Sequence, residues 1–138
     1  MYNFYKTLNL LGKGSFGKVY KILLNKDNKV YANKKINVLR QDVENSKNTL
    51  TELHILYHNT CPFIIDYYTC FFDNIQLSLI IKYCSYGDLG HVIHKNKKNG
   101  DFFEETDIWK IFIQIVYGLH YLHKNNIIHR DIKSANIF

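Results

Sequence analysis

The sequence predicts an α+β protein in two parts: a five-stranded sheet with one helix among its strands, followed by a helical part. Three observations support this prediction. β-rich runs flank a glycine-rich turn in the first third, the pattern turns helical from Gln41 to about His58, and a long amphipathic segment covers residues 106–124. With 138 residues, of which 46% are hydrophobic, the chain is large enough to bury a core.

The strands are predicted from short β-rich runs bounded by turn residues. Residues 6–25, KTLNLLGKGSFGKVYKILLN, contain two such runs, and NKDNK at residues 25–29 has the composition of a turn. Residues 30–38, VYANKKINV, predict a third strand. Two more are predicted at residues 62–73 and 75–83, with a turn between them.

The helices are predicted from the spacing of apolar residues. Leu50, Leu53 and Leu56 lie on one face of a helix between the third and fourth strands, and the chain becomes helical again after Asp88. Residues 106–124, TDIWKIFIQIVYGLHYLHK, carry one wide apolar stripe: Ile108, Ile111, Phe112, Ile115, Val116, Leu119 and Leu122. One short preceding helix is too small to cover this stripe, so we expect an exposed apolar patch and self-association of the chain.

Composition narrows the classes of function. The net charge of +6 fits an acidic partner, but A/T-rich codons explain the many Lys, Asn, Ile and Tyr residues equally well, and no nucleic-acid-binding motif is present. We therefore expect no nucleic-acid partner, and a solvated loop at residues 94–100, HKNKKNG. No apolar run is long enough to cross a membrane, and no signal-peptide pattern opens the chain. Cys61, Cys70 and Cys84 lack metal-ligand spacing, which favours reduced thiols and a cytoplasmic or nuclear protein.

Gly12, Gly14 and Gly17 form a G-x-G-x-x-G motif in LGKGSFGKV. Dinucleotide-binding folds use the same spacing, but there a helix follows the glycines. Here a short β-branched run follows, so a second strand is the better prediction. Glycines between two strands let backbone N–H groups approach phosphates, and Phe16 and Val19 fit a lid over a nucleotide. A purely structural hairpin has the same pattern, and the motif alone leaves both interpretations open.

Ala32 and Lys34 are two residues apart, so they share one face of the third predicted strand, and Lys35 points to the other face. A small residue beside a lysine leaves room for a flat ring and places an ammonium group near phosphates. A single lysine in a strand is more often a solvated edge residue, so this pattern needs support from elsewhere in the chain.

That support comes from the segment HRDIKSANIF, which carries the most specific set of polar residues: His129, Arg130, Asp131, Lys133 and Asn136. The glycine loop, YANKKI, LTELHIL with Glu52, IIKYCSYGDL and HRDIKSAN follow one another in the order seen in eukaryotic protein kinases. The chain therefore resembles a eukaryotic protein kinase domain over nearly its whole length. KYCSYGDL, QIVYGLHYLH and HRDIKSANIF are most similar to the NIMA-related kinases, and Lys133 two residues after Asp131 is typical of Ser/Thr kinases.

The resemblance implies an ATP site. Lys34 would hold the α- and β-phosphates and pair with Glu52, with Glu44 as the alternative partner. The glycines would cover the phosphates, and Val19 and Ala32 would enclose adenine. Ile81 matches the gatekeeper position, and the segment from Lys82 to Cys84 matches the hinge. Asp88 would lie near the ribose. The full set implied to bind ATP is Leu11, Gly12, Lys13, Gly14, Ser15, Phe16, Gly17, Lys18, Val19, Ala32, Lys34, Ile81, Lys82, Tyr83, Cys84 and Asp88.

The resemblance also implies the catalytic residues Asp131, Lys133, Asn136, Lys34 and Glu52. Asp131 would accept or orient the proton of a substrate hydroxyl, Lys133 would offset charge on the transferred phosphoryl group, and Asn136 would bind Mg²⁺. The cofactors implied are ATP and Mg²⁺, and the partner is a protein substrate with Ser or Thr.

The same resemblance implies a small lobe at residues 1–82, a hinge at 83–88 and the start of a large lobe at 89–138. Three positions depart from the family pattern without removing a catalytic group: Asn33, Lys82 and Tyr86. Catalysis in the family also uses a D-F-G aspartate, an activation segment and substrate-binding helices, which would follow Phe138. We therefore expect a truncated gene model, inactive alone. The alternative is a non-catalytic fragment that binds nucleotide or a partner kinase.

Overall fold

A computed structural model of the protein describes residues 4–14, 17–37, 43–58, 60–73 and 75–138, apart from the side chains of residues 43–48, 50 and 73. The chain divides into two compact units. The first unit contains residues 1–59 and 65–83, and the second contains residues 60–64 and 84–138. Among the described residues, no helix has the length and apolar character needed to span a membrane.

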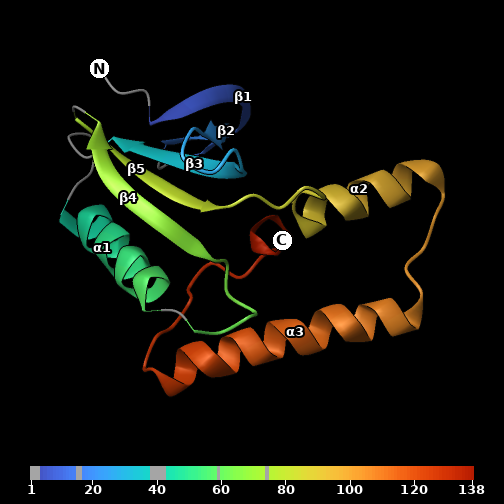
Figure 1. Ribbon diagram of the computed structural model, residues 1–138. Coiled ribbons are helices and arrows are strands. Elements are labelled where there is room, and N and C mark those ends of the chain that lie inside the picture. Colours follow the sequence, from blue (N-terminus) through green and yellow to red (C-terminus); the bar gives the residue numbers. More distant parts are fainter. Residues whose placement is uncertain (1–3, 15–16, 38–42, 59, 74) are drawn as a thin grey trace. The chain divides into compact units, whose positions relative to one another are not determined.

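The first unit is built on an antiparallel sheet with the strand order β1-β2-β3-β5-β4 (Figure 1). Helix α1 follows β3 in the chain and runs alongside the sheet, next to β4 (Figure 1). The predicted five strands and intervening helix are confirmed, although the fourth strand begins at Tyr67 and not at residue 62. The elements are β1 (Tyr5–Gly14), β2 (Gly17–Leu24), β3 (Val30–Asn37), α1 (Val43–Tyr57), β4 (Tyr67–Asp73) and β5 (Gln76–Lys82).

Both faces of the sheet carry buried apolar side chains. Successive residues of a strand point to opposite faces, and the central strands have apolar residues in both sets. On one face, Ile22, Leu24 and Ile80 are fully buried, and partly buried rings pack against them. These rings belong to Tyr5, Tyr20, Tyr31 and Phe71. The opposite face carries the buried side chains of Ala32, Ile36, Leu77 and Leu79.

Asn33 is a polar residue in this core. It is fully buried, and its Nδ2 donates a long hydrogen bond, 3.5 Å, to the hydroxyl of Ser78. Within the described part of the chain, its Oδ1 has no hydrogen-bond partner. A buried polar atom without a partner costs about 1–3 kcal/mol of stability. Asn33, where the family pattern has an apolar residue, therefore destabilises the sheet.

We expect the double variant Asn33→Leu/Ser78→Ala to raise the free energy of unfolding by about 1–3 kcal/mol, because it removes both buried polar groups and keeps the branched shape of residue 33. Urea denaturation followed by circular dichroism measures the change. Asn9→Leu, at an exposed position of β1, is the control and should change stability little. A double variant less stable than the natural protein would show that the amide is structurally required.

The second unit contains α2 (Leu89–Asn99), α3 (Glu105–Lys124) and a short 3₁₀ helix, η2 (Ser134–Asn136). Asp88 caps α2, since its carboxylate accepts the His91 N–H at 2.9 Å, and Gly100 ends the helix with φ +78°. The solvated loop predicted at residues 94–100 is therefore wrong, because residues 94–99 form the last turns of α2. Their lysines are exposed, so the side chains are solvated as expected, but on a helix.

The segment 60–64 packs on the C-terminal half of α3. The ring of Phe63 stacks on that of Tyr117, with 5.4 Å between centroids. The Tyr121 hydroxyl accepts the Thr60 N–H at 3.3 Å. Gly118 is buried here, because a Cβ at this position would lie 3.1 Å from the Phe63 carbonyl oxygen. A small residue is therefore needed where this segment crosses the helix.

The predicted stripe of α3 lies in two environments. Leu122 is buried, and Ile111, Ile115 and Leu119 are partly buried. The other three residues of the stripe are exposed: Ile108, Phe112 and Val116. The expectation that the stripe is only partly covered is thus confirmed.

Candidate active site

The glycines of the β1–β2 hairpin have different roles. Among the described residues, a Cβ added to Gly12 or Gly14 would meet no atom within 4 Å, so this part of the chain leaves the backbone of β1 open at both positions. Gly17 has φ +149°, and a Cβ there would overlap the carbonyl oxygen of Lys35 in the neighbouring strand. Gly17 is therefore required by the fold itself. Ser15 and Phe16, which the sequence also assigned to this loop, lie outside the described residues.

Strand pairing brings several of the predicted ATP-site residues onto one face of the sheet. Val19 is the cross-strand partner of Lys34, and Ala32 is the partner of Ile81. Partners in an antiparallel pair share a face, and residues 32 and 34 share one by the two-residue period. The face formed by Val19, Ala32, Lys34 and Ile81 places two branched apolar side chains and an alanine around the lysine.

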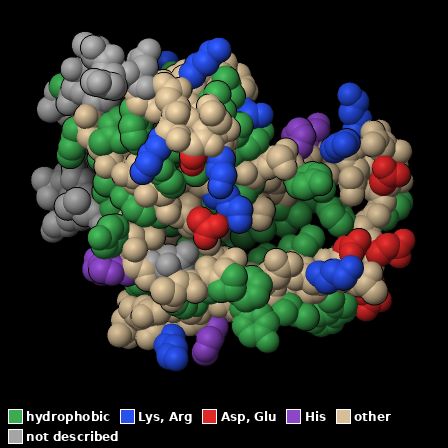
Figure 2. All heavy atoms as spheres, viewed as in Figure 1, with side chains coloured by type: hydrophobic (Ala, Val, Ile, Leu, Met, Phe, Trp, Pro, Cys, Tyr) green, Lys and Arg blue, Asp and Glu red, His purple; other side chains and the backbone are tan. Residues whose placement is uncertain are grey.

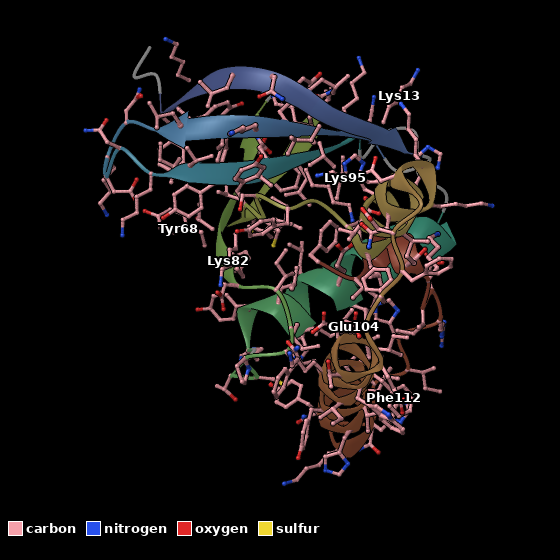
Figure 3. The ribbon with its side chains drawn as sticks, turned by 90° about the vertical axis from the view of Figure 1, so that its right-hand side faces the viewer. Lys13, Tyr68, Lys82, Lys95, Glu104 and Phe112 are labelled. Carbon is pink, nitrogen blue, oxygen red and sulfur yellow. The ribbon has the colours of Figure 1, made fainter. Side chains whose placement is uncertain are left out.

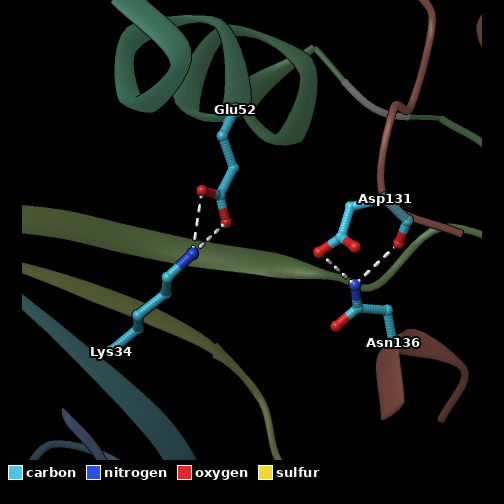
Figure 4. Close-up of polar contacts among 4 residues, drawn as sticks. All are labelled: Lys34, Glu52, Asp131 and Asn136. Atoms are coloured by element: carbon cyan, nitrogen blue, oxygen red, sulfur yellow. Dashed lines mark hydrogen bonds and ion pairs between the residues drawn. The ribbon is translucent and has the colours of Figure 1, made fainter. Parts of the chain in front are cut away.

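Lys34 forms an ion pair with both carboxylate oxygens of Glu52 in α1. Its Nζ lies 2.7 Å from Oε1 and 2.8 Å from Oε2 (Figure 4). The predicted pairing with Glu52 is confirmed, and the side chain of the alternative partner, Glu44, lies outside the described part of the chain. The two side chains remain 25% and 41% exposed. The pair therefore stabilises the fold only modestly, and its main effect is to fix the position of the ammonium group.

Lys35 points away from this face, as the strand period predicts. Its Nζ lies 5.8 Å from the centre of the Tyr5 ring, which packs on the opposite face of the sheet. The two adjacent lysines therefore differ in environment: Lys34 pairs with Glu52 of α1, and Lys35 lies beside the Tyr5 ring.

The segment expected to form the hinge begins at the end of β5. Lys82 donates to Asp66 at 3.1 Å, and both side chains are largely exposed. Lys82 lies at the same end of the sheet as Tyr68 (Figure 3). Tyr83 has the ammonium group of Lys21 4.5 Å from its ring centre. Sequence reasoning noted Lys82 as a departure from the family pattern but did not identify Asp66 as its ion-pair partner.

Asp88 and Gly90 have structural roles that the sequence reasoning did not assign. Asp88 caps α2 through one carboxylate oxygen, and an aspartate before a helix is a signal that could have been used. A Cβ at Gly90 would lie 3.0 Å from both Asp88 Oδ1 and Ser134 Oγ, so a glycine lets α2 pack closely on η2. The Leu89 N–H also donates to the carbonyl of Ile137 at 2.7 Å. These contacts hold the residues that follow Asp131 against the start of α2.

Asp131 is the centre of a polar cluster in the second unit. Its Oδ2 lies 2.8 Å from the Lys133 ammonium, and Asn136 Nδ2 donates to Oδ2 at 3.0 Å and to the Asp131 carbonyl at 2.8 Å (Figure 4). The Asp131 N–H donates to His129 Nδ1 at 3.2 Å. Lys133, followed by Asn136, holds the pKa of Asp131 below its ordinary value of 3.8. The carboxylate is exposed and stays ionised at neutral pH.

The Asp131 cluster offers one of the oxygen ligands that a magnesium ion bound to a nucleotide would need. Asn136 uses its Nδ2 to bind Asp131, so its Oδ1 is turned away from that carboxylate and remains as an oxygen ligand for a hard cation (Figure 4). Mg²⁺ is usually bound by one or two protein oxygens together with water and substrate phosphates. Among the described residues, no group of three or more His, Cys, Asp or Glu side chains offers a complete metal site of its own.

A five-stranded antiparallel sheet with a lysine ion-paired to the following helix, and an aspartate, lysine and asparagine in one loop, are typical of the protein kinase class of domains. The chain matches the protein kinase domain family over residues 5–138, so it belongs to that family.

The curated relatives are protein kinases. Serine/threonine-protein kinase Nek3 of Mus musculus is 35% identical over 97% of this chain and 25% of its own length. Nek1 of Mus musculus is 36% identical over 97% of this chain and 11% of its own length. Wee1-like protein kinase 2 of Homo sapiens is 34% identical over 93% of this chain and 23% of its own length. The expected similarity to NIMA-related kinases is confirmed, and the chain spans about a quarter or less of each of these relatives.

Proposed function

We propose that the protein is a Ser/Thr protein kinase, which transfers the γ-phosphoryl group of ATP to serine or threonine hydroxyls of protein substrates. The observation that carries the proposal is the Asp131 cluster. Within six residues it combines an ionised, exposed carboxylate, an ammonium group and an amide oxygen. Phosphoryl transfer depends mainly on positioning and on neutralising charge, and these three groups supply both.

The nucleotide is assigned to the face of the first unit that carries Lys34. The Lys34 ammonium, held by Glu52, would bind phosphate oxygens, and the open backbone at Gly12 and Gly14 would lie over them. The small Ala32 with Val19 and Ile81 would bind the adenine ring, and the backbone of residues 82–84 would meet its edge. Asn136 Oδ1 would be a ligand of Mg²⁺, which when bound neutralises charge on the phosphates.

Asp131 would orient the substrate hydroxyl and accept its proton. Its lowered pKa means that the carboxylate is already in the ionised form that this role requires at neutral pH. The Lys133 ammonium, 2.8 Å from that carboxylate, is close enough to offset negative charge that develops on the transferred group. The position of Lys133 two residues after Asp131 is the basis for proposing Ser and Thr as acceptors.

Label transfer tests the proposal. The protein that carries this chain is incubated with γ-labelled ATP, Mg²⁺ and peptide libraries in which the only acceptor is Ser, Thr or Tyr. We expect label on Ser and Thr peptides and at most trace label on Tyr peptides. Label confined to Tyr would contradict the assigned specificity. Nucleotide binding without transfer to any library would favour the alternative, a nucleotide-binding module without chemistry.

A further inference from the structure

Helix α2 carries a row of basic side chains along one face. We call this row the basic stripe, and it consists of His91, His94, Lys95 and Lys98. These residues follow the i, i+3, i+4, i+7 spacing that aligns side chains along a helix, and all of them are exposed. Figure 2 shows lysine and histidine side chains close together over α2, and Figure 3 labels Lys95. A different face of the helix, with Leu89, Val92 and Asn96, is partly buried.

The charges of the basic stripe are not neutralised within its own helix. The sequence of α2 contains no acidic residue. Lys95 and Lys98 are three residues apart, and like charges at this spacing destabilise a helix. Among the residues that the structure describes, neither of these lysines has an ion-pair partner within 4 Å. A negatively charged ligand would therefore be attracted by the whole row and would relieve the repulsion inside it.

The exposure of the basic stripe follows from its charge. A lysine side chain is almost never fully buried without a partner, because removing an ammonium group from water is too costly. An apolar face can be covered by any other apolar surface, whereas a row of ammonium groups requires water or acidic groups. Protein packed elsewhere on α2 would therefore leave these side chains in water or bring acidic groups to them.

The basic stripe begins beside the loop that contains Asp131, and both belong to the second unit. The first turn of α2 packs on this loop at Gly90, where a Cβ would lie 3.0 Å from Ser134 Oγ. His91, the first residue of the stripe, follows Gly90 directly. From His91 to Lys98 the row extends about 10 Å, at roughly 1.5 Å per residue. An extended peptide covers this length with about three residues.

We propose that the basic stripe binds a short acidic segment of the protein substrate, a run of Asp or Glu residues close to the serine or threonine that is phosphorylated. This inference rests on the kinase function proposed above and names the class of substrate. A membrane-binding helix needs apolar side chains beside its basic ones, and the stripe has none. Affinity for nucleic acid depends on many phosphate contacts, and a row of two helical turns offers few. A short acidic peptide matches both its length and its charge.

Steady-state kinetics of the protein that carries this chain measure the preference. The substrates are serine peptides in which an Asp triplet is moved stepwise before or after the serine, each compared with a peptide that carries Asn instead. We expect one placement to have a kcat/KM about 10–100-fold above that of its Asn counterpart, mainly through a lower KM. Added sodium chloride should reduce this advantage, because salt screens exposed charges.

Lys98→Glu should lower kcat/KM for the preferred acidic peptide by about fivefold to tenfold, because a repulsion replaces an attraction. The Asn peptide should stay within about twofold of its original value, since it carries no charge to repel. Lys97→Glu is the matched control: it makes the same charge change on the neighbouring residue, which lies about 100° around the helix and outside the basic stripe. Equal kinetics of acidic and Asn peptides at every placement, or equal effects of the two variants, would overturn the proposal.

A binding measurement separates this proposal from the kinase function itself. Fluorescence anisotropy follows a labelled acidic peptide in which alanine replaces the serine, so no transfer is required. Binding that is weakened by Lys98→Glu and not by Lys97→Glu supports the docking surface, even where no peptide accepts label and the kinase function fails. Activity without any preference for acidic peptides would overturn the docking surface and leave the kinase function intact. Tighter, Lys98-dependent binding of phosphatidylserine vesicles or of polyuridylate would overturn the choice of an acidic protein segment.

Discussion

In the protein that carries this chain, Lys34→Met is expected to lower kcat/KM for phosphoryl transfer by about 10²–10³-fold, the loss that follows removal of one charged group stabilising a transition state. Methionine keeps the length of the side chain but removes the ammonium group that Glu52 holds at 2.7 and 2.8 Å. Steady-state kinetics with MgATP and a serine peptide measure the effect. A direct nucleotide-binding assay shows how much of it is lost affinity.

Lys35→Met is the matched control for this variant. Lys35 is the next residue in β3, carries the same charge and faces the Tyr5 ring on the opposite side of the sheet. We expect its kcat/KM to stay within a few-fold of the natural protein. The opposite outcome, in which Lys35→Met is inactive and Lys34→Met is active, would refute the assignment of the nucleotide to the Lys34 face.

Asp131→Asn is expected to lower kcat by about 10²–10⁴-fold, the range for loss of a general base. Asparagine keeps an oxygen that can accept from Asn136 Nδ2, so the loop should retain its shape while the negative charge is lost. Single-turnover kinetics measure the chemical step directly. Asp107→Asn is a suitable control, because Asp107 is also an exposed aspartate paired with a lysine, at 2.9 Å from Lys110. Unchanged turnover in Asp131→Asn would exclude Asp131 as the base.

The pH profile gives an independent check on Asp131. Lys133 and Asn136 lower the pKa of Asp131 below its ordinary value of 3.8. Protonation of this carboxylate should therefore reduce kcat/KM only at a pH below 3.8. Lys133→Met removes the largest cause of the shift and should move that limb upward towards 3.8. Carbon-13 NMR of the Asp131 carboxyl group follows the same titration without relying on activity.

Local sequence patterns predicted most of the elements correctly, and the exceptions have physical explanations. The strands and α3 follow from two-residue and 3.6-residue periods, which depend only on neighbouring residues. The C-terminal turns of α2 were missed because residues 94–99 are rich in Lys and Asn. This helix is exposed on most sides and needs few apolar residues. Its two caps, Asp88 and Gly100, were the better signals.

The sequence alone was sufficient for the order of the strands and helices along the chain, for the opposite directions of Lys34 and Lys35, and for the set of polar residues from Asp131 to Asn136. All of these depend on spacing along a short stretch of backbone. Tertiary structure decided which residues meet across long separations. It pairs Lys34 with Glu52, leaves the Asn33 amide buried beside Ser78, and makes Gly17 necessary against Lys35. It also divides the apolar residues of α3 between a buried and an exposed face, because the position of segment 60–64 on that helix is a property of the packed unit.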